Sequence, residues 1–298
     1  MTASPDPHFL TPHGTVPDQE AEASHPTIAR VNGVLLDKAF EEHTEMGIFQ
    51  ADLDLARKID DDVPGYRQAL AAQRQFLADA IALAATERQV SQFVVLRAAL
   101  PLGAAEETEH TLARAHVANP TTVLVARETF TSAHQGIVLA KQGQERTAAV
   151  HAAVHEVHWP LHAVHKPGNW SLDLGKPVGL TMAGDPSHWP GDVRELLRAY
   201  HRELAPGSMV AVSALGPAPA GTRAAAALEA LARHLRRTPE PELTLRDRAE
   251  IEDWFTGTGW NLHDPGVAPV SHWAEPPPEG LAGPELPVWC AIATKAAS

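Results

Sequence analysis

The residues best suited to chemistry lie in one short segment, Ala183-Gly184-Asp185-Pro186-Ser187-His188-Trp189-Pro190. A carboxylate and an imidazole so close together form a candidate acid/base pair, and a neighbouring indole offers an apolar wall. The alternative is a tight Asp-Pro turn in which His188 is an ordinary polar loop residue. We predict Asp185 and His188 as catalytic candidates and Trp189 as a residue lining their cleft.

Histidines form a second cluster, at positions 151, 155, 158, 162 and 165. On a single helix the first four would share one face, a spacing that presents imidazoles to a metal ion. Pro160 is expected to interrupt such a helix, and Glu156 is followed too soon by His158 for a His-Glu-x-x-His motif. The sequence therefore favours surface or pocket-lining histidines, with His155 as a candidate cleft residue, and we assign no metal ligand.

The elements that must position these residues follow from alternating apolar runs and helical segments. The runs are 93–96, 122–125, 148–150, 178–182 and 209–212, and the helices between them are 106–117, 131–141, 192–204 and 222–236. This rhythm predicts an α/β fold with a mainly parallel sheet and helices on both faces. A helix at 246–255 and strands at 260–262 and 288–293 predict a closing antiparallel pair. Ligands of such folds lie beyond the carboxyl ends of the strands, where Asp185 and His188 fall.

The N-terminal part is expected to differ from the rest. Residues 1–25 are polar, rich in proline and without periodicity, which predicts a mobile tail. Helical patterns at 27–36, 50–59 and 66–85 predict a helical extension over 26–88. Residues 26–298 are interpreted as one domain.

Several segments then narrow the choice of fold. They are Pro26-Thr27-Ile28-Ala29-Arg30-Val31, Lys176-Pro177-Val178, Leu204-Ala205-Pro206-Gly207-Ser208 and the stretch from Asp264 to Trp273. In them the sequence resembles an actinobacterial family of S-adenosylmethionine-dependent methyltransferases, long catalogued as a domain of unknown function. The resemblance implies a Rossmann-like class I methyltransferase fold, with a mainly parallel seven-stranded sheet and a C-terminal antiparallel strand. It implies S-adenosylmethionine as cofactor if the family activity is retained.

The residues that hold the cofactor in that family are replaced here. Its Asp-Ile-Gly-Ser-Gly turn corresponds to residues 95–99, so that Arg97 and Ala99 stand where glycines let the backbone approach the cofactor. In the family, acidic residues end the second and third strands. The corresponding positions here are Ala126 and, approximately, Ala153. Glu128 could take the place of the first acidic residue only if its loop shifts. We expect the standard cofactor mode to be lost, with Arg97 projecting either into the cofactor space or outward to solvent.

Composition excludes several classes of function. A formal net charge of −13 opposes binding to nucleic acid, and the apolar runs are far shorter than a membrane span. Cys290 is the only cysteine, which excludes an internal disulfide and a cysteine-cluster metal site. The N-terminus lacks the basic and apolar regions of a signal peptide, so we expect a cytoplasmic protein.

Three functional hypotheses follow. The leading one is a methyltransferase-like protein that has lost standard S-adenosylmethionine binding. It would use the former cofactor and substrate cleft either for another small molecule, with acid/base catalysis in specialised metabolism, or for a protein partner. Its cleft would be lined by Arg97, Ala99, Glu128, His155 and Trp189. The second is an active methyltransferase with a divergent cofactor mode. The third is a non-catalytic binding or regulatory protein, for example a homodimer formed through the proline-rich loop between Trp273 and Pro287.

Overall fold

The structure is a computed structural model, and it describes residues 9–10, 25–36, 48–97, 109–141, 145–165, 169–182, 186–189, 191–273 and 286–296. Its centre is a nine-stranded sheet with the order β1-β4-β3-β2-β5-β6-β9-β7, in which β8 pairs with β9. The strands are β1 (Phe9–Leu10), β2 (Gln92–Leu96), β3 (Thr121–Ala126), β4 (Thr147–His151), β5 (Gly179–Met182), β6 (Met209–Leu215), β7 (Trp260–Leu262), β8 (Ala268–Pro269) and β9 (Val288–Lys295).

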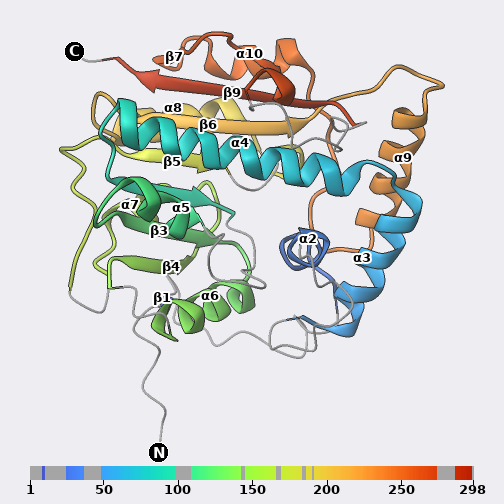
Figure 1. Ribbon diagram of the computed structural model, residues 1–298, viewed down its shortest axis with the longest axis horizontal. Coiled ribbons are helices and arrows are strands. Elements are labelled where there is room, and N and C mark those ends of the chain that lie inside the picture. Colours follow the sequence, from blue (N-terminus) through green and yellow to red (C-terminus); the bar gives the residue numbers. More distant parts are fainter. Residues whose placement is uncertain are drawn as a thin grey trace, which may run out of the picture.

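The five inner strands from β4 to β6 run parallel, and β9 runs antiparallel to β6, to β7 and to β8. Figure 1 shows the strands stacked in this order from β7 to β1. The predicted parallel sheet and its closing antiparallel strands are thus present. Two further strands of two residues each, β1 and β8, were not predicted because so short a pairing has no sequence pattern of its own.

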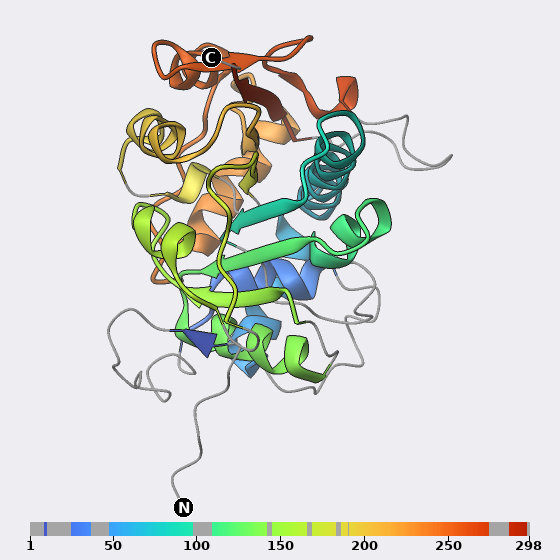
Figure 2. The same cartoon turned by 90° about the vertical axis from the view of Figure 1, so that its left-hand side faces the viewer.

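Helices cover both faces of the sheet. They are α2 (Ile28–Leu36), α3 (Gln50–Asp62), α4 (Tyr66–Glu87), α5 (Glu109–His116), α6 (Thr129–Lys141), α7 (His158–His162), α8 (Val193–Glu203), α9 (Arg223–Leu235) and α10 (Arg248–Phe255), with short 3-10 helices η2 (Pro186–His188) and η3 (Val270–His272). Figure 2 shows α4 and α5 on one side of the strands and α7 and α8 on the other.

Alternate residues of the central strands enter different cores. Val94 and Leu96 pack with side chains of α8 and α10, whereas Phe93 packs with those of α4 on the opposite face. All five residues of β2 are buried, as are all six of β3. Burial on both faces is the reason why these strands read as continuous apolar runs.

Local sequence signals place the helix ends close to their predicted positions. The Asp192 carboxylate accepts from the backbone N–H of Arg194 at 2.8 Å and so caps α8. Asp247 caps α10 in the same way. Gly207, between α8 and β6, has φ of +85°, a conformation that favours glycine.

Pro160 was expected to interrupt a helix that would carry the histidines from position 151 to 162, and no such helix forms: His151 ends β4, and α7 spans only His158–His162. Pro160 itself lies in the first turn of this short helix, where its missing N–H has no helical acceptor to lose.

The N-terminal helices lie beside one end of the sheet, where α2, α3 and α9 gather (Figure 1). They pack into the same core as α4, with Val31, Ile59 and Leu231 fully buried. The helical extension therefore forms a wall next to the strand ends. None of the helices within the described ranges is long and apolar enough to cross a membrane.

Candidate functional site

The carboxyl ends of β2, β3, β4 and β5 meet at one edge of the sheet. Strand register places Leu96 beside Val125 and Met182, and Ala126 beside His151. The residues that follow these strands therefore converge at the edge where doubly wound folds bind ligands.

Arg97 follows β2 directly and has φ of 53°, which a non-glycine residue seldom adopts. Its side chain is 9% exposed, so it turns into the protein and not outward to solvent. One guanidinium nitrogen donates to the carbonyl of His188 at 3.1 Å, and another donates to Glu240 at 2.7 Å. The backbone at this position thus keeps a glycine-like conformation, while the side chain fills the space beside it.

Glu240 is the centre of this cluster. Its carboxylate is 2% exposed and accepts from both Arg97 and Arg127, each at 2.7 Å. Burial favours the neutral acid, but the two guanidinium groups outweigh it and lower the pKa of Glu240. The carboxylate is therefore held ionised between two cations.

The segment that carries Glu240 joins α9 to α10 and crosses the strand ends. The Thr244 N–H donates to the carbonyl of Ser187 at 2.8 Å, and the Arg246 N–H donates to the carbonyl of Leu215 at 2.9 Å. These bonds tie the segment to η2 and to the end of β6. Glu240 is thereby fixed over the edge of the sheet.

Glu128, two residues after β3, binds the N-terminal wall. Its Oε2 atom accepts from the hydroxyls of Thr27 and Thr131, both at 2.8 Å, and lies 3.7 Å from an Arg30 guanidinium nitrogen. Burial raises the pKa of Glu128, and the nearby Glu240 carboxylate raises it further. Glu128 thus anchors α2 to the sheet edge.

Arg30 extends this network away from the sheet. It is fully buried, and its Nε donates to Asp52 at 2.8 Å, a carboxylate that also accepts from two backbone N–H groups, those of Thr27 and Phe49. A buried ion pair of this kind depends on such additional hydrogen bonds.

His155 and Trp189 line a cavity of about 470 Å³, and Trp189 directly follows His188, whose carbonyl accepts from Arg97. Its other walls come from residues before α7 and from the first turns of α8, namely Val154, Val157, Gly191, Asp192, Val193, Glu195, Leu196 and Ala199. Trp189 is 5% exposed, and its indole N–H has no hydrogen-bond partner among the described residues. The cavity is within the size range of small-molecule sites.

The remaining predicted site residues fall in different places. His188 is buried at the end of η2, and it is not among the residues that line the cavity. Asp185 and Ala99 lie outside the described residues, as does most of the proline-rich loop before β9. Ala126 ends β3, and the Ala153 N–H donates to Glu156.

The histidine-rich segment does not form one face. His151 ends β4, where its Nε2 lies 2.9 Å from the Arg127 carbonyl, and His165 is fully buried against Trp170. His158 and His162 alone share a helix.

Sequence reasoning missed Glu240, Arg127 and the buried Arg30–Asp52 pair. Glu240 lies in Thr238-Pro239-Glu240-Pro241-Glu242, which has no periodicity and looks like an ordinary linker. Arg30 lies within a segment that carries the family resemblance, and this was the one available signal for it.

The family model described as S-adenosyl methyltransferase matches residues 15–296. Among solved structures, a candidate methyltransferase from Thermobifida fusca YX is 26% identical, with 95% of this chain and 100% of that chain covered and a TM-score of 0.75. A DUF574 family protein from Streptomyces avermitilis MA-4680 is 23% identical, with 92% and 99% covered and a TM-score of 0.74. A comparison with curated protein sequences found no match.

Proposed function

Since this chain belongs to the S-adenosyl methyltransferase family and has its class I fold, we propose that it has lost the standard mode of cofactor binding and binds a different small molecule in the adjoining cavity. The observation that carries the proposal is the position of Arg97, held inward by Glu240 and by the His188 carbonyl.

S-adenosylmethionine does not fit the described residues in its standard position. In class I methyltransferases the backbone after the first central strand approaches the methionine part of the cofactor, which requires open space. Here the Arg97 side chain occupies that end of β2. A guanidinium group also repels the positively charged sulfonium. The residues present thus oppose the standard mode, and we derive no methyl-transfer step.

The cavity beside Trp189 is the candidate ligand site. Its largely apolar walls suit a planar or hydrophobic ligand. The Asp192 carboxylate caps α8, and Glu195 pairs with Arg198, so both are already engaged. The acid/base roles of Asp185 and His188 stay predictions.

Two measurements, a calorimetric titration and a thermal-shift screen, test the proposal. Calorimetric titration with S-adenosylmethionine and with S-adenosylhomocysteine should give no binding, and micromolar affinity for either would refute the loss of the standard mode. A thermal-shift screen should give ligands whose effect is abolished by Ala199→Phe, which fills the cavity. Ala226→Phe, on the exposed face of α9, is the matched control and should leave the ligand effect unchanged.

A second candidate is an active methyltransferase with a divergent cofactor mode. Family membership favours it, and Glu128 places a carboxyl group close to the end of β3, where a ribose is held in the family. Its Oε2 already accepts from two threonine hydroxyls, which argues against that role. Cofactor binding that is weakened by Glu128→Gln would favour this candidate over the first.

A further inference from the structure

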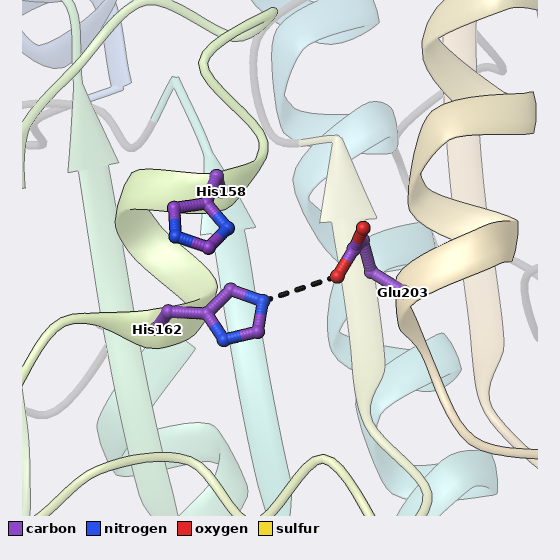
Figure 3. A group of neighbouring side chains, drawn as sticks. All are labelled: His158, His162 and Glu203. Carbon is purple, nitrogen blue, oxygen red and sulfur yellow. Dashed lines mark hydrogen bonds and ion pairs between the residues drawn. The ribbon is translucent and has the colours of Figure 1, made fainter.

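Three side chains outside the cleft bring metal-ligating atoms together. His158, His162 and Glu203 each offer one such atom, and these atoms all lie within 4.8 Å of one another. Figure 3 shows the two imidazoles one above the other on α7, with Glu203 opposite them. All three side chains are exposed.

The geometry follows from the two helices. His158 and His162 are four residues apart on α7 and share one face, with ring centroids 4.1 Å apart and planes inclined by 23°. Glu203 is the last residue of α8, and its Oε2 lies 3.1 Å from the Nε2 of His162. Two segments far apart in the sequence thus present an imidazole pair and a carboxylate to the same point.

We propose that His158, His162 and Glu203 bind a divalent transition-metal ion, with Zn²⁺ as the best match. Two imidazoles and one carboxylate are a ligand set that zinc uses when it keeps an open position. With metal-ligand bonds of about 2.1 Å, the ligand atoms of a tetrahedral site lie about 3.4 Å apart. The His162–Glu203 distance already meets this, and the exposed His158 side chain has room to close on the ion.

Local charge also favours a cation. Glu203 ends α8, where the unpaired carbonyl groups of the last turn carry partial negative charge. The net charge of −13 attracts cations to the protein as a whole. Imidazole ligands select Zn²⁺, Co²⁺, Ni²⁺ or Cu²⁺ over Mg²⁺ and Ca²⁺, which prefer oxygen.

A bound ion would join α7 to α8. Val157, the residue before α7, and residues 191–199 at the start of α8 also line the 470 Å³ cavity. His162 also lines a second cavity, of about 490 Å³, together with Leu161 and Asp173. The open coordination position therefore stays accessible to water.

Calorimetric titration of the chelator-treated, tag-free full-length protein with ZnCl₂ tests the site. The wild-type protein should have a micromolar zinc site that is weakened at least tenfold by His158→Ala and by Glu203→Gln. His116→Ala, which removes an exposed histidine at the end of α5, is the control and should bind zinc as the wild type does. MgCl₂ should bind far more weakly. Zinc should raise the melting temperature of the wild type but not that of His158→Ala.

The proposal is overturned if no micromolar zinc site is found, or if His158→Ala and Glu203→Gln bind zinc with wild-type affinity. In either case the His162–Glu203 contact is an ordinary exposed hydrogen bond. Because the ion is titrated without any organic ligand, neither result depends on the proposed small-molecule function.

Discussion

Replacing Arg97 by glycine separates two opposing effects at the end of β2. The side chain makes hydrogen bonds to Glu240 and to the His188 carbonyl, and removing charged hydrogen bonds of this kind costs about 2 kcal/mol. Glu240 keeps its bond to Arg127, which limits the loss. The backbone, at φ of 53°, is strained for arginine, and glycine removes about 1–2 kcal/mol of strain.

Glycine also has more conformational freedom than arginine in the unfolded chain, which lowers the free energy of unfolding by about 0.4–1 kcal/mol. Arg97→Gly should therefore unfold with a free energy lower than that of the wild type by about 1 kcal/mol. Arg97→Met loses the same hydrogen bonds but keeps the strain, so its loss should be about 2 kcal/mol.

Urea unfolding followed by circular dichroism measures both differences, provided that the denaturant slopes agree. The order wild type, Arg97→Gly, Arg97→Met is the expected result. If Arg97→Gly is more stable than the wild type, the Arg97–Glu240 contact contributes less than the strain, and this contact is not what holds Arg97 inward. If both variants unfold alike, the strain at the positive φ is no larger than the opposing entropy of glycine in the unfolded chain, about 0.4–1 kcal/mol.

Three further perturbations test buried contacts of the core. Of the two carboxylates that the described residues place beside the fully buried Arg30, Asp52→Asn removes the nearer and leaves Glu128, at 3.7 Å. The free energy of unfolding should fall by about 3 kcal/mol, so a loss below about 1 kcal/mol in urea unfolding would contradict the buried pair. Gly179→Ala places a Cβ 2.7 Å from the Phe93 ring and should cost about 1–3 kcal/mol, whereas an unchanged melting temperature would show that the ring yields freely. Burial lowers the pKa of His165 to about 4, so the unfolded chain takes up a proton before the folded protein does as the pH falls. About 3 kcal/mol of stability should therefore be lost between about pH 6.5 and pH 4. His165→Phe should lose less stability over that range, and urea unfolding at both pH values measures the difference.

The elements of the fold were predictable because each has its own periodicity and its own end signals. The predicted run 122–125 lies within β3, and the predicted helix 192–204 differs from α8 by one residue at each end. Helix α7 was not predicted, because its five residues are too few to show a helical periodicity.

The candidate site was predictable only in part. The family resemblance predicts that Arg97 stands in the place of a glycine, and Arg97 has the positive φ that favours glycine. Its partner Glu240 follows α9 in a segment without periodicity, and it lies 143 residues away in the chain. Such a contact depends on where the whole sheet places the two segments, and one sequence carries no local signal for it.

The sequence by itself determined the order of strands and helices along the chain and the buried runs of the parallel sheet. These are local properties, set by the residue types and their spacing. The tertiary structure decided which way Arg97 turns, since its inward position depends on a carboxylate supplied by a distant loop. The tertiary structure also decided which side chain lies beside the histidines of α7. His162 contacts Glu203 because α7 and α8 cover the same face of the sheet.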